Sequence, residues 1–193
     1  LSGNFGPVET ESTVSDLKVQ GEIPQDLVGR LLRIGPNPVA PAENHHWFAG
    51  NGFVHGLRLR DGKAEWYRSR FVRDDLVCEF KGWPRTEGPR FREDSSGLAN
   101  TNVIGVGGRT YAIVEGGGFP MELDYELETV QSSNFDGGLA GPFSAHPKRD
   151  PETGEFHAAG YFSGWDHLQH VVISAEGKVL RTVDIPVPGR PMV

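Results

Sequence analysis

Short apolar runs separated by turn sequences recur along most of this chain. Tyr111–Val114 and Val171–Ile173 are typical of buried strand centres, and Leu57–Arg60 alternates as a half-solvated strand does. The predicted hairpins are 53–60 with 63–71 around Asp61-Gly62, 102–106 with 109–115 around Gly107-Gly108, 143–146 with 155–162 around Asp150–Gly154, and 168–175 with 178–185 around Glu176-Gly177. The pattern therefore indicates antiparallel sheets built from short strands.

One segment departs from this pattern. Asp74–Lys81 predicts a single short helix with Asp74 or Asp75 at its N-terminus, and no other segment sustains a repeat of 3.6 residues. Hairpins spaced this regularly predict an all-β protein. A β-propeller and a β-sandwich both suit the strand pattern, because the predicted blades do not resemble one another in sequence.

Composition and charge narrow the functional classes. The chain has 193 residues, of which 37% are hydrophobic and 23% charged, so it is globular rather than disordered. A net charge of −7 argues against a nucleic-acid-binding surface, which needs clustered Lys and Arg. Cys78 is the single cysteine, so neither an intrachain disulfide nor a cysteine-based metal site is available. This cysteine usage fits a reducing compartment, and the cytoplasm is the expected location.

His146 is a candidate metal ligand. It precedes Pro147, whose ring excludes the α conformation from the residue before it, so the histidine lies on extended backbone at a predicted strand end. Such a residue can donate a ring nitrogen to a metal. Taken alone, however, one histidine among seven favours a structural role.

Three sequence motifs that occur in a fixed order bear on the role of His146. They are the stretch Gly21–Pro38, the stretch His46–Gly56 and the stretch Ala145–Lys148. In this order and spacing they resemble the N-terminal part of the carotenoid cleavage oxygenase family, which also includes lignostilbene dioxygenases and the retinal pigment epithelial isomerase. The resemblance runs along the whole chain.

The resemblance implies a seven-bladed β-propeller, of which this chain would supply about two to three blades. It further implies iron(II) on the propeller axis, held by four histidines, with His146 as the first of them. The implied reaction is a dioxygenase reaction, the oxidative cleavage of a conjugated carbon–carbon double bond into two carbonyl products, with iron(II) as the only cofactor. Imidazole ligands and an open coordination position suit iron chemistry with dioxygen.

Two further residues gain a role from the resemblance. Glu115 is by itself a solvated strand-end carboxylate, but the matching glutamate in the family accepts a hydrogen bond from an iron-bound histidine. That histidine is expected beyond Val193, which would leave Glu115 without its partner here. Thr101 matches a threonine whose methyl group lies near a vacant iron position. Both are expected to serve the catalytic site.

Other positions bear on the substrate and on local structure. Val114 stands where lignostilbene-cleaving relatives tend to carry lysine, which favours an apolar polyene over a phenolic stilbene. The family usually has Phe-Asp-Gly-Asp-Gly where this chain has 48–52, so both acidic positions are lost, to Ala49 and Asn51. We expect the glycines there to supply positive φ angles and the turn to form.

The remaining histidines are expected to be structural or solvated: His45, His46, His55, His157, His167 and His170.

The chain is expected to be the N-terminal part of a single propeller domain over residues 1–193, truncated at both ends. A second ligand is expected directly after the stretch 188–193, so the chain alone would neither hold iron tightly nor be active. The expected partners are an apolar conjugated substrate and dioxygen, and peripheral membrane contact of the parent protein is an open alternative.

Three alternatives remain at this point. The first is a stilbene-cleaving dioxygenase. The second is a degenerate, non-catalytic propeller scaffold, which the two missing acidic residues favour. The third is a calcium-dependent propeller hydrolase, for which Asn100, Asn102 and Asp136 would be a poor ligand set.

Overall fold

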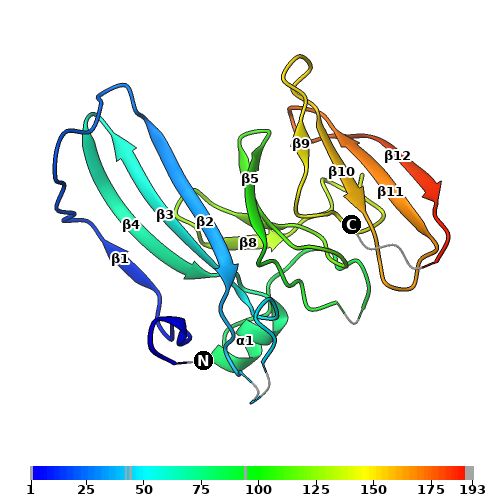
Figure 1. Cartoon of the computed structure of the whole chain (residues 1–193), viewed down its shortest axis with the longest axis horizontal. Helices are drawn as coiled ribbons and strands as arrows, with labels where there is room; N and C mark the ends of the chain where they lie inside the picture. The colour runs from blue at the N-terminus through cyan, green and yellow to red at the C-terminus, as the bar shows by residue number, and fades with distance from the viewer. Residues whose placement is uncertain (1, 42, 44, 94, 190–193) are drawn as a thin grey trace.

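The computed structural model describes residues 2–41, 43, 45–93 and 95–189, and places them in three four-stranded antiparallel sheets (Figure 1). The first sheet has the order β1-β4-β3-β2, the second β5-β6-β7-β8 and the third β12-β11-β10-β9. The strands are β1 (Ser12–Val14), β2 (Gly29–Pro36), β3 (Gly52–Arg60), β4 (Lys63–Phe71), β5 (Asn102–Val106), β6 (Arg109–Ile113), β7 (Met121–Leu123), β8 (Thr129–Ser132), β9 (Lys148–Arg149), β10 (Phe156–Gly160), β11 (His167–Ile173) and β12 (Val179–Pro186). A short 3₁₀ helix, η1 (Gly3–Phe5), and one α-helix, α1 (Asp75–Lys81), complete the elements.

The sheets follow one another as blades in an arc (Figure 1). Strands β2, β5 and β9 each form an edge of their own sheet, and these edges face the middle of the arc. This arrangement confirms the all-β class and the propeller over the sandwich.

Two of the predicted hairpins have the turns that their sequences indicate. Asp61 and Gly62 have φ values of 49° and 70°, and Gly107 and Gly108 have 57° and 77°. Positive φ at both central residues is the signature of a type I′ turn, whose twist matches that of the flanking strands. The strands β3–β4 and β5–β6 pair around these turns with residues 53 and 71, and 102 and 113, opposite each other.

The third predicted hairpin is shorter than expected. Residues 143–146 do not form a strand, and β9 contains only Lys148 and Arg149, which pair with His157 and Phe156. Phe143 instead donates its amide to the Gly118 carbonyl across to the second sheet. Pro147 cannot donate a ladder hydrogen bond, so the strand begins only after it.

Two buried layers join the sheets. The first and second sheets enclose Val54, Val72, Ala99, Ala112, Met121, Leu123 and Leu127. The second and third sheets enclose a larger, aromatic layer of Val106, Tyr111, Ile113, Phe119, Phe135, Leu139, Phe143, Ala145, Ala158, Val171 and Ile173. The blades are therefore held face to face by apolar packing, as layered β architectures are.

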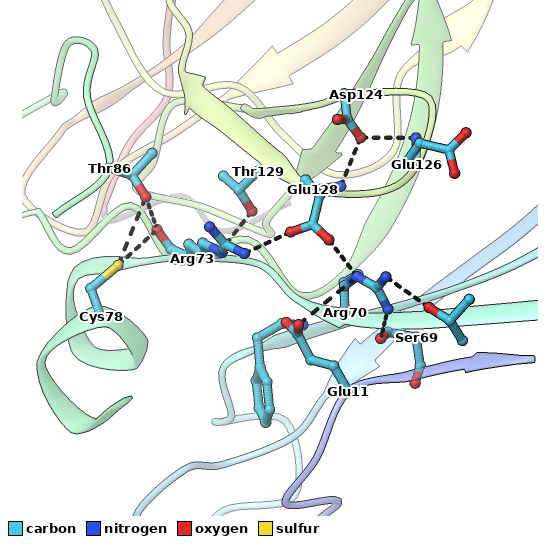
Figure 2. A network of polar contacts seen from close by, with 12 residues as sticks. Glu11, Ser69, Arg70, Arg73, Cys78, Thr86, Asp124, Glu126, Glu128 and Thr129 are labelled. Carbon is cyan, nitrogen blue, oxygen red and sulfur yellow. Dashed lines mark hydrogen bonds and ion pairs between the residues drawn. The ribbon is translucent and has the colours of Figure 1, made fainter. Parts of the chain in front are cut away.

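A polar network adds a second link between the first two sheets (Figure 2). The Arg70 Nε donates to Glu128 at 2.6 Å, and the Arg73 guanidinium donates to the other Glu128 oxygen, also at 2.6 Å. Arg70 also donates to the Ser12 carbonyl and to the Thr13 hydroxyl, at 2.8 and 2.9 Å. The single carboxylate of Glu128, directly before β8, thus joins β4, and through Arg70 the N-terminal segment, to the second sheet.

The predicted helix is present as α1. The Asp74 carboxylate caps it by accepting the Val77 amide at 2.9 Å, and Gly82 ends it in the left-handed conformation with φ 68°. Within the part of the chain that the structure describes, no helix is long and apolar enough to span a bilayer.

Candidate functional site

An open cavity of about 750 Å³ lies where the three sheets meet. Its walls come from the end of β2, the loop 46–49, the segment before β5, the residues after β6, the segment before β9 and the residue after β10. The lining residues are Ile34, Gly35, Pro36, His46, Phe48, Ala49, Leu98, Asn100, Thr101, Val114, Glu115, Gly116, His146 and Tyr161. All three of the predicted site residues, Thr101, Glu115 and His146, therefore line one cavity.

His146 presents its ring to this cavity. Its side chain is 62% exposed, although Ala145 before it is fully buried. The Asn102 side chain at the start of β5 donates to the Ala145 carbonyl at 2.9 Å, which ties this segment to the second sheet. The ring is thus accessible while its backbone is anchored, which is what a metal ligand requires.

Glu115 lies directly beside His146 in the cavity. The His146 Nε2 lies 2.9 Å from the Glu115 Oε2. The histidine that the resemblance assigns to Glu115 as its partner was expected beyond Val193, so that expectation stays a prediction. Both carboxylate oxygens are nevertheless buried, and neither accepts a well-aligned hydrogen bond from the described residues. Buried acceptors are almost always paired, so this carboxylate is suited to a further N–H donor.

Thr101 is held by two hydrogen bonds. Its hydroxyl donates to the Asn100 Oδ1 at 2.9 Å and accepts the Glu115 amide at 3.2 Å. The backbone of Glu115 is thereby fixed to the entry of β5. Because the hydroxyl is engaged, the methyl group is the part of Thr101 left for the cavity.

The loop carrying Phe48 and Ala49 is fastened despite the two lost acidic residues. The Asn100 side-chain amide donates to the Phe48 and Gly50 carbonyls at 3.2 and 2.7 Å. The buried Asn51 donates to both oxygens of Asp74, at 3.1 and 2.9 Å. Burial raises the pKa of Asp74, while the hydrogen bond from Asn51 lowers it. Asn51, which stands at one of the two lost acidic positions, therefore has Asp74 as its hydrogen-bond partner.

The glycines of this loop serve a different purpose from the one expected. Neither Gly50 nor Gly52 is among the residues with positive φ. A Cβ at Gly52 would instead lie 1.9 Å from the Ala99 carbonyl oxygen, and one at Gly50 would lie 2.9 Å from the Asn37 amide nitrogen. The requirement is close approach of two backbones rather than a left-handed conformation.

Sequence reasoning missed two polar residues of the cavity. His46 lines it and accepts the Phe48 amide on Nδ1 at 3.3 Å. Tyr161 is 8% exposed, and burial, together with the adjacent Glu115 carboxylate, raises the pKa of its phenol to about 12. His46 opens the second motif, His46–Gly56, but was expected to be structural or solvated, and no motif marks Tyr161, which follows the end of β10.

The other histidines lie outside the cavity. His157 is only partly solvated, with 35% of its side chain exposed, and its Nδ1 lies 3.1 Å from the His170 Nε2 with the two rings stacked. The His55 Nδ1 lies 2.7 Å from the Tyr67 hydroxyl, and burial lowers the pKa of His55. His167 stacks on Trp165. These imidazoles pair with neighbours in their own sheets.

The described residues fit one part of an iron site. Among them, no three His, Cys, Asp or Glu side chains gather into a complete ligand set. One accessible imidazole and an under-paired buried carboxylate nevertheless face each other in one cavity.

Asn100 and Asn102, the ligands of a calcium alternative, instead donate to backbone carbonyls. The stretch predicted to precede a second ligand, 188–193, lies outside the described residues from position 190 onward.

Comparison with known proteins decides the family. Residues 5–193 match the family model described as retinal pigment epithelial membrane protein. The chain belongs to this family. It is the carotenoid cleavage oxygenase family that the three sequence motifs predict.

Relatives in this family have named activities. The chain is 50% identical over 197 residues to a carotenoid cleavage oxygenase of Mycobacterium tuberculosis, an alignment that covers all of this chain and 39% of the relative. It is 35% identical to a carotenoid 9,10(9′,10′)-cleavage dioxygenase of Pisum sativum, covering 97% of this chain and 40% of the relative. The chain thus spans about two fifths of the length of the curated relatives that it matches.

Solved structures agree with the fold. The lignostilbene dioxygenase of Pseudomonas brassicacearum superposes with a TM-score of 0.82 at 30% identity, covering 97% of this chain and 42% of that one. A variant of the Synechocystis apocarotenoid oxygenase gives a TM-score of 0.79 at 26% identity, covering 96% and 44%. The three blades described here are therefore the blades of that architecture.

Proposed function

We propose that the protein is a non-haem iron(II) dioxygenase that cleaves a conjugated carbon–carbon double bond of a carotenoid or apocarotenoid to carbonyl products. The observation that carries this proposal is the cavity in which His146, Glu115 and Thr101 meet beneath largely apolar walls. The similarity to carotenoid-cleaving relatives supports it.

Each of the three residues has a distinct role in the proposal. His146 would hold the iron through a ring nitrogen, and the remaining ligands would come from outside the described residues. The buried Glu115 carboxylate would accept an N–H of a coordinating imidazole and so orient that ring. Thr101 would keep its methyl group toward the cavity and restrict what enters there, because its hydroxyl is bound. Bound iron(II) supplies the activation of dioxygen.

The walls of the cavity favour a long apolar substrate. Leu98 and Val114 form part of the wall, and Val114 directly precedes Glu115. An aliphatic side chain gives a polyene apolar contact and offers no charged group to a phenolic oxygen. The carotenoid substrate is therefore preferred over the stilbene, even though both activities occur among the relatives.

The test uses the full-length protein, reconstituted with iron(II) under air. Carotenoid, apocarotenoid and stilbene substrates are offered in parallel, and carbonyl products are detected by mass spectrometry. We expect dialdehyde or aldehyde products from the polyenes, slower or absent cleavage of the stilbene, and loss of products in His146→Ala. His157→Ala is the matched control, because that imidazole pairs with His170 away from the cavity.

Two results would overturn the proposal. Preferential cleavage of the stilbene would favour the stilbene-cleaving alternative. An iron-loaded protein that yields no carbonyl product from any substrate would favour the non-catalytic scaffold.

A further inference from the structure

His46 lines the same cavity as His146 but comes from a different part of the fold, the loop between β2 and β3 of the first sheet. It opens the stretch His46–Gly56, and the proposed iron site does not use it. The loop makes a tight turn here, because the His46 carbonyl accepts the Ala49 amide at 2.9 Å. The backbone that carries this imidazole is therefore fixed on the cavity wall.

The His46 ring is held by contacts within its own loop. Its Nδ1 accepts the Phe48 amide at 3.3 Å, and the two rings pack edge to face with 5.7 Å between their centroids. Asn100 fastens the same loop by donating to the Phe48 carbonyl. Trp47, between the two rings, packs on Phe5 and lines a separate cavity. Of three consecutive rings, the first and third thus line the cavity of the proposed iron site.

These contacts determine which nitrogen of the ring can bind a ligand. A neutral imidazole has one N–H donor and one acceptor nitrogen, and Nδ1 of His46 is the acceptor because it takes the Phe48 amide hydrogen. The proton therefore lies on Nε2. Among the described residues, nothing accepts a hydrogen bond from Nε2. A hydrogen-bond donor is thus left for a ligand on the cavity wall.

The other polar side chains of the cavity have partners or lie beside the proposed iron site. Asn100 uses its amide hydrogens on two backbone carbonyls, and its oxygen accepts a neighbouring hydroxyl. Glu115 and His146 lie 2.9 Å apart and form the proposed iron site. Tyr161 packs on the backbone that directly follows Glu115. His46 is therefore the polar side chain best placed to meet a part of the substrate away from the iron.

A donor on a largely apolar wall favours one class of ligand. Apolar residues such as Ile34 and Leu98 give a polyene chain its contacts. A pure hydrocarbon offers nothing to an N–H group, whereas a hydroxyl or carbonyl oxygen on the same chain accepts from it. A site that hydrogen-bonds a substrate group discriminates against the analogue that lacks this group.

We propose that His46 is a specificity-determining residue, which selects oxygen-bearing polyenes by donating its Nε2–H to a hydroxyl or carbonyl oxygen of the substrate. The inference rests on the proposed function and deepens it, because it narrows the substrate class from polyenes in general to oxygenated polyenes. His46 binds the substrate and takes no part in holding the iron.

The test compares two substitutions of His46 in the full-length protein. Asparagine can still accept the Phe48 amide on its side-chain oxygen, but it is too short to place a donor where Nε2 lies. Glutamine is longer and can place an amide N–H there. His46→Asn should therefore keep the loop and lose the donor, whereas His46→Gln should keep the donor. His45→Asn is the matched control, because His45 lines the separate cavity.

Two polyenes with the same conjugated chain serve as probes, one ending in a hydrocarbon ring and one with a hydroxyl on that ring. The iron-loaded protein is kept under nitrogen, so that the polyene is bound but not oxidised, and Kd is measured by quenching of tryptophan fluorescence. We expect the wild type to bind the hydroxylated polyene about fivefold more tightly, the size of one net neutral hydrogen bond. His46→Asn should lose this preference and bind the hydrocarbon polyene as the wild type does. His46→Gln should restore most of the preference, and the control should match the wild type.

Several outcomes would overturn the inference and leave the proposed function intact. One is a wild type that binds both polyenes equally, and another is a His46→Asn protein that keeps the preference. Equal weakening of both polyenes by His46→Asn would assign the histidine a structural role instead. A wild type that shows the preference but cleaves no polyene under air would overturn the proposed function alone. A wild type that binds neither polyene would overturn both.

Discussion

Asn51→Asp restores the acidic residue that family members usually carry, and here it should destabilise the protein. Asn51 is buried and donates to both oxygens of Asp74, which is 0% exposed. The substitution replaces an N–H donor about 3 Å from this carboxylate with a second carboxylate. The site must then hold either two negative charges or one extra proton.

The expected loss of stability is set by whichever of these two states costs less free energy. Two unit charges about 3 Å apart repel by about 5 kcal/mol at an effective dielectric constant of about 20. Keeping a carboxyl of ordinary pKa, about 3.9, protonated at pH 7 costs about 4 kcal/mol, at about 1.4 kcal/mol per pH unit. Protonation is the cheaper state, so the expected loss at pH 7 is about 4 kcal/mol.

The pH dependence has a definite sign. Burial raises the pKa of Asp74, and a second carboxylate raises the pKa of the pair further. A folded-state pKa above the unfolded value means that the native state binds the extra proton. The stability of the variant is therefore greatest in acid and falls as pH rises from the unfolded pKa toward the folded one. At pH 5 the loss should shrink to about 1.5 kcal/mol.

Urea unfolding of wild type and variant at both pH values measures this difference. Asn134→Asp is the matched control, because Asn134 uses its side-chain oxygen to accept the Gly137 amide and aspartate can do the same. Equal destabilisation by Asn51→Asp at pH 5 and pH 7, or none at either, would refute the proton-sharing argument.

Two further substitutions test the blade contacts. Glu128→Gln weakens the link from β8 to Arg70 and Arg73 (Figure 2), and because these side chains are partly solvated we expect a loss of about 1 kcal/mol that diminishes in high salt, measured by urea unfolding. A salt-independent loss would contradict this. Gly52→Ala should cost about 3 kcal/mol or more, because its Cβ would meet the Ala99 carbonyl, whereas Gly105→Ala, with 3.9 Å of clearance, should change the melting temperature little.

The hairpins were predictable where turn chemistry is explicit. Asp61-Gly62 and Gly107-Gly108 predict type I′ turns, and the structure has both. Strands of three or four residues such as β7 (Met121–Leu123) and β8 (Thr129–Ser132) are too short to show a period. They form because neighbouring strands and the buried layers complete them, which a local pattern does not record.

The candidate site, too, was predictable from the sequence only in part. His146 was found through its motif, and Glu115 through a resemblance, since Glu115 lies 31 positions before His146 and no local pattern joins them. Tyr161 carried no signal at all, because its proximity to Glu115 depends on how two sheets pack. Gly52 was recognised, but its physical reason, close approach to Ala99, required coordinates.

The central claim is that His146 binds the catalytic iron in this cavity. Its most direct test is the iron content of the full-length protein by elemental analysis, for wild type, His146→Ala and the control His157→Ala. The account predicts about one iron per chain in the wild type and the control, and almost none in His146→Ala. Full iron occupancy in His146→Ala would contradict it.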